Sequence, residues 1–220
     1  MHKNRITYKD TVAYKYAMDI VTKKVKAGKY IIQQCQIFLD DLEKQFDDDF
    51  LWKFDLDIYE VITGFQNFFK FADGINAGKK MQLADFQLFI ISNLFCWVHK
   101  EEGYVRYSKA YIQVARKNGK SMLLSFMGLI KALLCEYGQI YAVATKRDQS
   151  AIIANEVRKL CDQSIPEIRD RFKIYGKAQI NKIVCSLTQS EIAPLSSDAN
   201  TLDGLIKLVP IYSNIYSKPL

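Results

Sequence analysis

Residues 1–80 carry the hydrophobic spacing of amphipathic helices. Between Lys9 and Gly28, apolar side chains return at every third or fourth position with lysines between them, and Gly28 is a suitable stop. Two further stretches repeat this period. The positions expected to face a core are Ala13, Ala17, Ile20 and Val21, then Ile31, Cys35, Phe38 and Leu42, then Ile58, Val61, Ile62, Phe65 and Phe69. The pattern predicts an N-terminal helical segment over residues 1–80.

Residues 81–205 change to an alternation of strands and helices. β-branched and aromatic residues mark four short runs, at residues 110–115, 139–145, 181–187 and 191–195. Helical periodicity lies between them, at 121–137 and again after 145, where the inner face would be Ile153, Val157, Leu160 and Cys161. Strands separated by helices form βαβ units. We expect an α/β fold with a parallel sheet flanked by helices on both faces.

The helix expected at 121–137 is apolar nearly all round, as a helix enclosed on both sides would be. Its exceptions form one stripe of small residues, where the helix could approach the sheet closely: Ser121, Ser125, Gly128 and Ala132.

Composition narrows the class of protein only slightly. The 220 residues are 49% hydrophobic and 25% charged, as in ordinary globular proteins, and the net charge of +7 is compatible with an anionic partner such as a nucleotide or nucleic acid. No apolar run reaches the roughly 20 residues that span a bilayer, and the N-terminus lacks the apolar core of a secretory signal. The cysteines are odd in number and contain no CxxC pair, which favours a reducing cytosol and buried thiols without zinc or disulfides: Cys35, Cys96, Cys135, Cys161 and Cys185.

One stretch, "VARKNGKS" at residues 114–121, has the composition of a phosphate-binding loop. In such a loop, backbone N–H groups surround phosphate oxygens, Gly119 permits the tight turn, Lys120 reaches the β- and γ-phosphates, and the Ser121 hydroxyl binds Mg²⁺. Gly-Lys-Ser alone is a weak signal, and Val114 stands where the usual pattern has its first glycine. The flanking strand and helix favour the loop over a surface turn. Arg116 and Lys117 are open to two interpretations, solvated side chains or phosphate contacts.

Two other polar features of the sequence have structural interpretations that do not involve a ligand. The acidic run Asp47-Asp48-Asp49 has no further ligands spaced around it, so a solvated loop is favoured over a metal site. Thr145 ends an expected strand, and with Asp148 three residues on, its main role is expected to be capping of the next helix.

Four blocks in order resemble the large terminase subunit of tailed bacteriophages: "DFQLFIISNLFCWV", "VARKNGKS", "YAVATKRDQSAI" and "PLSSDANTLDGL". The resemblance covers nearly all of residues 10–205. It implies an ATP-driven motor that packages DNA into procapsids, with a P-loop ATPase domain, here partial and over residues 81–205, followed in the family by a nuclease.

The resemblance also assigns residues. The family uses a deviant loop with an early arginine, which Arg116 matches, so that Arg116 and Lys120 become the expected catalytic residues. Gln87 matches the glutamine that recognises adenine, with Phe86 beside it. The residues implied to hold ATP are Gln87, Val114, Ala115, Arg116, Lys117, Asn118, Gly119, Lys120 and Ser121, and Ser121 would also hold Mg²⁺. The implied partners are double-stranded DNA, the portal, the small terminase subunit and further copies of the chain, in the cytoplasm of a bacterial host.

The acidic end of the next strand is missing. After the polar loop Ser196–Gly204, the family has an apolar strand ending in Asp-Glu, which holds the metal and activates water. Residues 206–220, "IKLVPIYSNIYSKPL", contain no carboxylate, and neither Asp198 nor Asp203 ends an apolar strand or precedes a glutamate. We therefore expect a truncated or frame-disrupted terminase with an aberrant tail at 206–220, without a nuclease, that hydrolyses ATP poorly. The alternatives are a catalytically inactive DNA- or partner-binding remnant of a prophage terminase and, ranked last, a small P-loop kinase.

Overall fold

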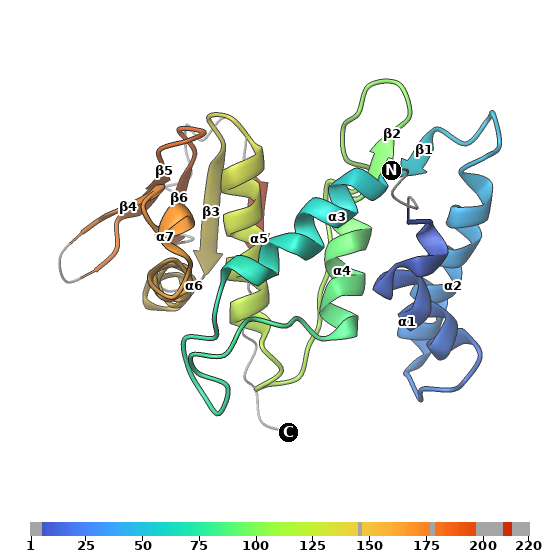
Figure 1. Cartoon of the computed structure of the whole chain (residues 1–220), viewed down its shortest axis with the longest axis horizontal. Helices are drawn as coiled ribbons and strands as arrows, with labels where there is room; N and C mark the ends of the chain where they lie inside the picture. The colour runs from blue at the N-terminus through green and yellow to red at the C-terminus, as the bar shows by residue number, and fades with distance from the viewer. Residues whose placement is uncertain (1–5, 145–146, 177–178, 197–208, 213–220) are drawn as a thin grey trace, which may run out of the picture. The chain divides into compact units, whose positions relative to one another are not determined.

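The computed structural model of the chain describes residues 6–144, 147–176, 179–196 and 209–212. The chain divides into two compact units, each built from two separate segments (Figure 1). Unit 1 comprises Met1–Gln66 and Gln82–Gln113, and unit 2 comprises Asn67–Met81 and Val114–Leu220. This division differs from the boundary expected at residue 80, because each unit takes a segment from both sides of it.

Unit 1 is mainly helical. Its elements are the 3₁₀ turn η1 (Tyr8–Asp10), α1 (Val12–Val21), α2 (Lys29–Lys44), β1 (Trp52–Phe54), α3 (Leu56–Phe65), α4 (Asp85–Phe95) and β2 (Trp97–His99). A second 3₁₀ turn, η2 (Gln66–Phe68), follows α3 and spans the boundary between the two units. Side chains fix two of the helix starts. The Thr11 hydroxyl accepts the N–H of Tyr14 at 3.1 Å, and the Asp55 carboxylate accepts the N–H of Ile58 at 3.0 Å. β1 and β2 pair as a short antiparallel ribbon.

An aromatic cluster explains why residues 82–113 join the N-terminal helices. The fully buried Phe38 ring of α2 packs edge-on against Phe54, Phe89 and Trp97, with ring centroids 5.2–6.1 Å apart. Most of the predicted core positions of α1 and α2 are confirmed: Ala13, Ala17, Ile20, Cys35, Phe38 and Leu42 are buried. Two positions expected inside, Ile31 and Val61, are 46% and 52% exposed.

Unit 2 is built on a five-stranded sheet in the order β4-β5-β6-β3-β7. The strands are β3 (Gln139–Ala144), β4 (Phe172–Tyr175), β5 (Lys182–Cys185), β6 (Glu191–Ser196) and β7 (Val209–Tyr212). β6 and β7 both pair in parallel with β3, whereas β4, β5 and β6 pair antiparallel. The expected α/β class is correct, but the sheet is mixed and not purely parallel. The reason is local, since β4 and β5 are joined by a short connection, which permits only antiparallel pairing.

The strand expected at residues 110–115 is not present. These residues have no strand partner among the described parts of the chain, and Tyr111 is 84% exposed. A β-rich composition produces a strand only where a neighbouring strand accepts its backbone hydrogen bonds, so the prediction from composition was wrong.

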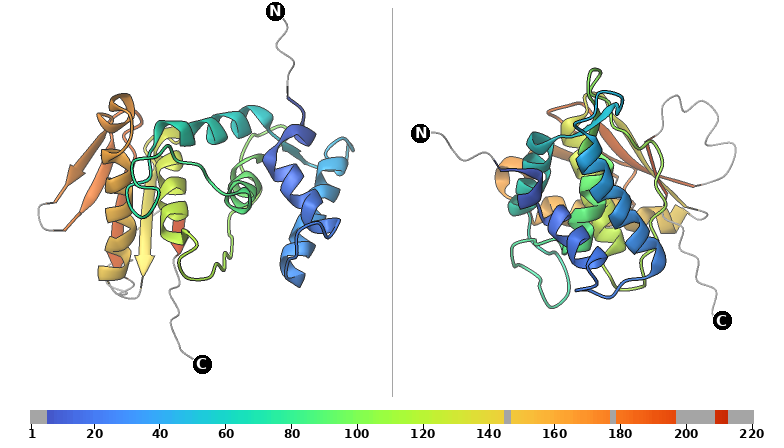
Figure 2. Two further views of the ribbon diagram at one scale, coloured as in Figure 1. Left: turned by 60° about the horizontal axis from the view of Figure 1, so that its bottom comes forward. Right: turned by 90° about the vertical axis from the view of Figure 1, so that its right-hand side faces the viewer.

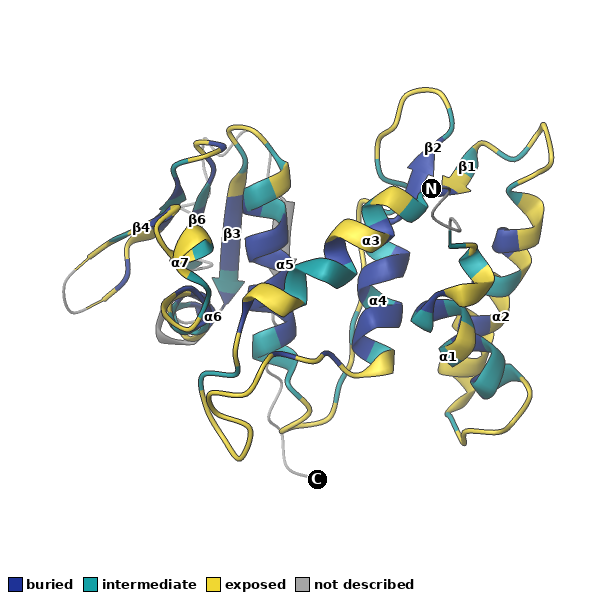
Figure 3. Cartoon of the chain, viewed as in Figure 1, coloured by how far each residue is buried: buried dark blue, intermediate teal, exposed yellow. Residues whose placement is uncertain are grey.

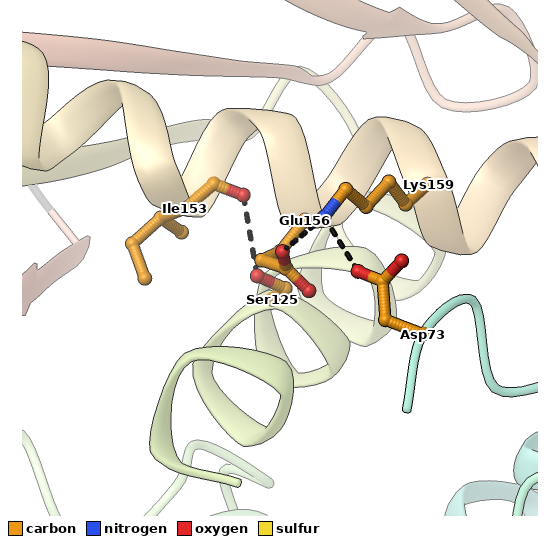
Figure 4. Close-up of polar contacts among 5 residues, drawn as sticks. All are labelled: Asp73, Ser125, Ile153, Glu156 and Lys159. Atoms are coloured by element: carbon orange, nitrogen blue, oxygen red, sulfur yellow. Dashed lines mark hydrogen bonds and ion pairs between the residues drawn. The ribbon is translucent and has the colours of Figure 1, made fainter. Parts of the chain in front are cut away.

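The helices of unit 2 are α5 (Lys120–Leu134), α6 (Arg147–Asp162) and the short α7 (Pro166–Arg169). The expected inner face of α6 is confirmed, because Ile153, Val157, Leu160 and Cys161 are at most 3% exposed. Helix α5 packs more extensively on α6 than on the sheet, and Ser125 of its small-residue stripe lies at the contact with α6. The fully buried Ser125 hydroxyl donates to the Ile153 carbonyl of α6 at 3.2 Å (Figure 4). Small side chains thus let two helices approach each other.

The segment Asn67–Met81 packs within unit 2. Phe69 is fully buried, with its ring edge-on to Phe126 of α5 at 5.8 Å. Lys159 of α6 donates to Asp73 at 2.6 Å and to Glu156 at 2.9 Å (Figure 4), and these hydrogen bonds raise the Lys159 pKa. An apolar anchor and an exposed ion pair therefore hold this segment against the two helices.

Burial follows the elements closely, with β3 and the middle of α5 buried (Figure 3). The five cysteines are free thiols, and as expected most are buried, Cys135 being half-buried. Within the described residues, no helix combines the length and hydrophobicity needed to cross a bilayer.

Candidate functional site

The loop 114–121 contains two residues with left-handed backbone. Lys117 has φ +67°, and Gly119, directly before α5, has φ +70° and ψ +22°. Glycine adopts this conformation freely, whereas lysine does so rarely. The Asn118 amide lies 3.4 Å from the Ala115 carbonyl. Alternating turns of this kind, placed before a helix, direct successive backbone N–H groups toward one point, as in anion-binding loops.

Helix α5 begins at Lys120 without a side-chain cap. Gly119 offers only its carbonyl, which accepts the Leu123 N–H at 2.9 Å, and no described side chain accepts the first N–H groups of the helix. These groups give the helix start a partial positive charge. Lys120 and Ser121 are half-buried in this first turn, whereas Ala115, Arg116, Lys117 and Asn118 are exposed and Val114 is half-buried.

The start of α5 lies at the end of unit 2 where the parallel strands finish. α5 runs antiparallel to β3, so Lys120 and Ala144 lie toward the same end (Figures 1 and 2). The lengths agree, because 15 helical residues at about 1.5 Å each match 6 strand residues at about 3.3 Å each. β6 and β7 run parallel to β3 and end at this edge too. Ligands of α/β sheets bind at such carboxyl-terminal edges.

Gln87 lies in unit 1, in α4. It is 4% exposed, and its side-chain oxygen accepts the Ala84 N–H at 3.0 Å at the start of the helix. Its expected contact with adenine remains a prediction, as do the roles of the loop residues. Phe86 beside it is half-buried. Thr145, Asp198, Asp203 and the rest of the loop after Ser196 lie outside the described residues.

Strand β7 lies within the tail 206–220 that was expected to be aberrant. Its backbone pairs with β3 from Val209 opposite Ile140 to Tyr212 opposite Val143. The strand has the sequence VPIY, so no carboxylate lies on it. Among the described residues, no group of three or more histidine, cysteine or acidic side chains is placed to hold a metal ion. The described residues therefore offer the Ser121 hydroxyl to a cation, but no acidic cluster.

These features define an α/β protein whose mixed sheet accompanies a glycine-lysine turn at the start of a helix. The family model described as "Terminase large subunit, ATPase domain" matches residues 85–216, which is more than half of the chain. The chain therefore belongs to the terminase large subunit family and carries its ATPase region. The resemblance recognised from the four sequence blocks is confirmed.

A solved structure supports the same assignment. The crystal structure of the HK97 bacteriophage large terminase matches with a TM-score of 0.54 and 25% sequence identity, over 67% of this chain. The match covers only 29% of the HK97 chain. No curated protein sequence matches this chain.

Proposed function

We propose that the loop 114–121 binds the phosphates of ATP. The observation that carries this proposal is the pair of left-handed residues, Lys117 and Gly119, immediately before the uncapped start of α5. The backbone N–H groups of residues 114–119 would surround the phosphates, and the Lys120 ammonium would contact the β- and γ-phosphates. Arg116, exposed on the same loop, would stabilise negative charge at the γ-phosphate.

Mg²⁺ would be held by Ser121. The ion would neutralise charge on the β- and γ-phosphates. The residues of this chain fit it in part, since a half-buried hydroxyl stands in the first turn of α5 but β7 carries no acid. A carboxylate at the end of the strand beside β3 is what would position the metal through water and activate the attacking water. We therefore infer that the chain binds ATP and hydrolyses it slowly.

In the whole motor, this region would be the ATPase portion that drives viral DNA into procapsids. The partners would be double-stranded DNA, the portal, the small terminase subunit and further copies of the chain, and the location would be the cytoplasm of the bacterial host. Membership of the terminase large subunit family supports this assignment.

A second candidate function follows from β7. Because that strand has no acid, the chain is alternatively a catalytically inactive remnant of a prophage terminase that binds DNA or a protein partner. In that case its affinity for duplex DNA would depend steeply on salt and would be indifferent to ATP.

Titration of the full chain with a fluorescent ATP analogue and Mg²⁺ tests the nucleotide site. Lys120→Ala removes one charge-assisted contact, so we expect a loss of affinity of about 10- to 100-fold. Lys173→Ala, an exposed lysine of β4 in the same unit, is the matched control and should bind as the wild type. Equal affinity in Lys120→Ala would overturn the nucleotide site.

Phosphate release on the same samples tests the second half of the proposal. We expect slow phosphate release from the wild type and still slower release from Lys120→Ala. Robust turnover that disappears in Lys120→Ala would show that an acid from elsewhere in the chain completes the site.

A further inference from the structure

The connection between α1 and α2 concentrates positive charge. Residues 23–29, here called the lysine turn, contain Lys23, Lys24, Lys26 and Lys29, and no acidic residue occurs from 20 to 39. All four lysines are exposed, and the whole connection lies at the surface of unit 1 (Figure 3). The lysine turn is thus a compact positive patch on a unit that is otherwise of mixed charge.

Most of this charge is uncompensated. Lys24 forms an ion pair with Asp19 at 2.8 Å, and both side chains are largely open to water. Among the described residues, no hydrogen bond or ion pair involves the side chains of Lys23, Lys26 or Lys29. Three like charges within seven residues repel one another, and a polyanion that binds them relieves this repulsion.

The backbone at Lys23 is unfavourable for a lysine. Lys23 has φ +62° and follows the last turn of α1. Its N–H donates to the Ile20 carbonyl at 3.1 Å, and the Val25 N–H donates to the Asp19 carbonyl at 3.0 Å, which is a helix-ending arrangement that usually has glycine at the left-handed position. A side chain in a strained position motivates a hypothesis of function.

The charge of Lys29 is also unfavourable for the helix that it begins. It is the first residue of α2, where the helix start is positive, and Gly28 provides no side-chain cap. The positive charge of Lys29 therefore opposes the macrodipole at the start of α2, so helix stability does not account for a lysine at this position.

We propose that the lysine turn binds the phosphate backbone of double-stranded DNA. Lysine ammonium groups act as mobile point charges that suit phosphates and read no base sequence, and a dense line of phosphates is the partner that gains most from several adjacent lysines. Tyr30, 79% exposed beside the turn, offers a further hydroxyl to the backbone. The inference rests on the proposed DNA partner and is independent of nucleotide binding.

The experiment measures the salt dependence of DNA affinity for the full chain. A labelled duplex of about 30 base pairs is titrated at about 50 to 200 mM KCl with the wild type, with Lys23→Gln/Lys26→Gln/Lys29→Gln, and with a control triple variant. The control, Lys15→Gln/Lys44→Gln/Lys53→Gln, removes the same charge from exposed, scattered lysines of the same unit. The slope of log K against log[salt] is negative, and we expect the turn variant to make it shallower by about 2.7, at about 0.9 per phosphate contact. Wild-type affinity would then fall about 40-fold more than that of the variant across this range.

Three results would overturn the proposal. The first is that the wild type does not bind DNA. The second is that the wild type and the turn variant have equal slopes of log K against log[salt]. The third is that the control variant changes this slope as much as the turn variant does. Sedimentation velocity could instead show a salt-sensitive self-association that only the turn variant loses. This result would also overturn the proposal, because the lysine turn would then bind the acidic run Asp47-Asp48-Asp49 of a second copy. ATP titration of the turn variant should be unchanged, and Lys120→Ala should keep the wild-type DNA slope, so that the two proposals fail separately.

A single substitution provides an independent check. Lys23→Gly relieves the left-handed backbone, so we expect the melting temperature to rise by about 2 °C, while the negative slope of log K against log[salt] becomes shallower by about 0.9. If the variant became more stable with an unchanged slope, Lys23 would not contact DNA.

Discussion

The Arg106 guanidinium donates a hydrogen bond of 2.7 Å to the Asp41 carboxylate, joining residues 65 positions apart in unit 1. Asp41 is nearly buried in α2, with its side chain 8% exposed, and Arg106 follows β2 with its side chain 20% exposed. The same guanidinium lies 5.1–5.9 Å from the ring centroids of Phe50, Trp52, Trp97 and Tyr107. This ion pair, surrounded by aromatic rings, links the α2 helix to the segment 97–107.

Removing Arg106 should destabilise unit 1 strongly. Arg106→Ala leaves the Asp41 carboxylate largely buried without its partner, and it removes the cation from the aromatic rings, so we expect a loss of about 3 kcal/mol in the free energy of unfolding. Urea denaturation followed by tryptophan fluorescence measures it, since Trp52 and Trp97 both lie in this unit. Lys24→Ala, which breaks an exposed pair in the same unit, should cost less than about 0.5 kcal/mol. Similar losses for the two variants would contradict the importance of burial.

Within unit 2, the anchor of the segment Asn67–Met81 should be apolar and not ionic. Phe69→Ala removes a fully buried ring that packs on Phe126, and we expect a loss of about 3–4 kcal/mol. Asp73→Ala breaks the exposed ion pair to Lys159 and should cost less than about 1 kcal/mol. Chemical denaturation of both variants gives the comparison, and a larger loss for Asp73→Ala would reverse the assignment.

Burial should make stability fall at alkaline pH. Burial raises the pKa of the Cys35 thiol from 9.0 to about 11 and that of Cys161 to about 12. A raised folded-state pKa means that the stabilising effect is complete below pH 9.0 and is lost as the pH rises toward 11 and 12, because the unfolded thiols ionise first. Within that window, each thiol lowers the free energy of unfolding by about 1.4 kcal/mol for each pH unit.

Unfolding midpoints measured from pH 8 to about 10.5 test this. Cys161→Ala should flatten the pH dependence, whereas Cys135→Ala, at a half-buried position, serves as the control. An unchanged slope in Cys161→Ala would show that other groups dominate the alkaline loss.

Periodicity located the cores of the helices because each helix buries a local pattern. Cys35, Phe38 and Leu42 of α2, and Ile153 and Val157 of α6, are buried as the 3.6-residue spacing predicts. The turn at Gly119 was likewise predictable, since glycine followed by a helix start is a local signal.

Pairing between distant segments could not be predicted in the same way. The run 110–115 has strand composition but no described strand beside it, whereas the tail expected to be aberrant contains β7, which pairs with β3. The small residues of α5 were expected to approach the sheet, whereas Ser125 of that stripe contacts α6. The local surroundings of Gln87 were equally hidden, because the resemblance gave this residue a nucleotide role but did not indicate that its side chain is buried at the start of α4.

Gln87 allows a structural role to be separated from a nucleotide role. Its side-chain oxygen accepts the Ala84 N–H, a contact that Gln87→Glu keeps, so the stability of this variant should stay within about 0.5 kcal/mol of the wild type. Glutamate cannot donate a hydrogen bond, so if the amide recognises adenine, Gln87→Glu should bind the ATP analogue about 10-fold more weakly while binding the GTP analogue unchanged. Gln87→Ala should lose both the cap, at about 1 kcal/mol, and the preference for ATP. Competition titrations and thermal melts of the two variants distinguish the nucleotide role from the structural role. If Gln87→Glu kept the wild-type preference for ATP, Gln87 would act only as a cap of the helix.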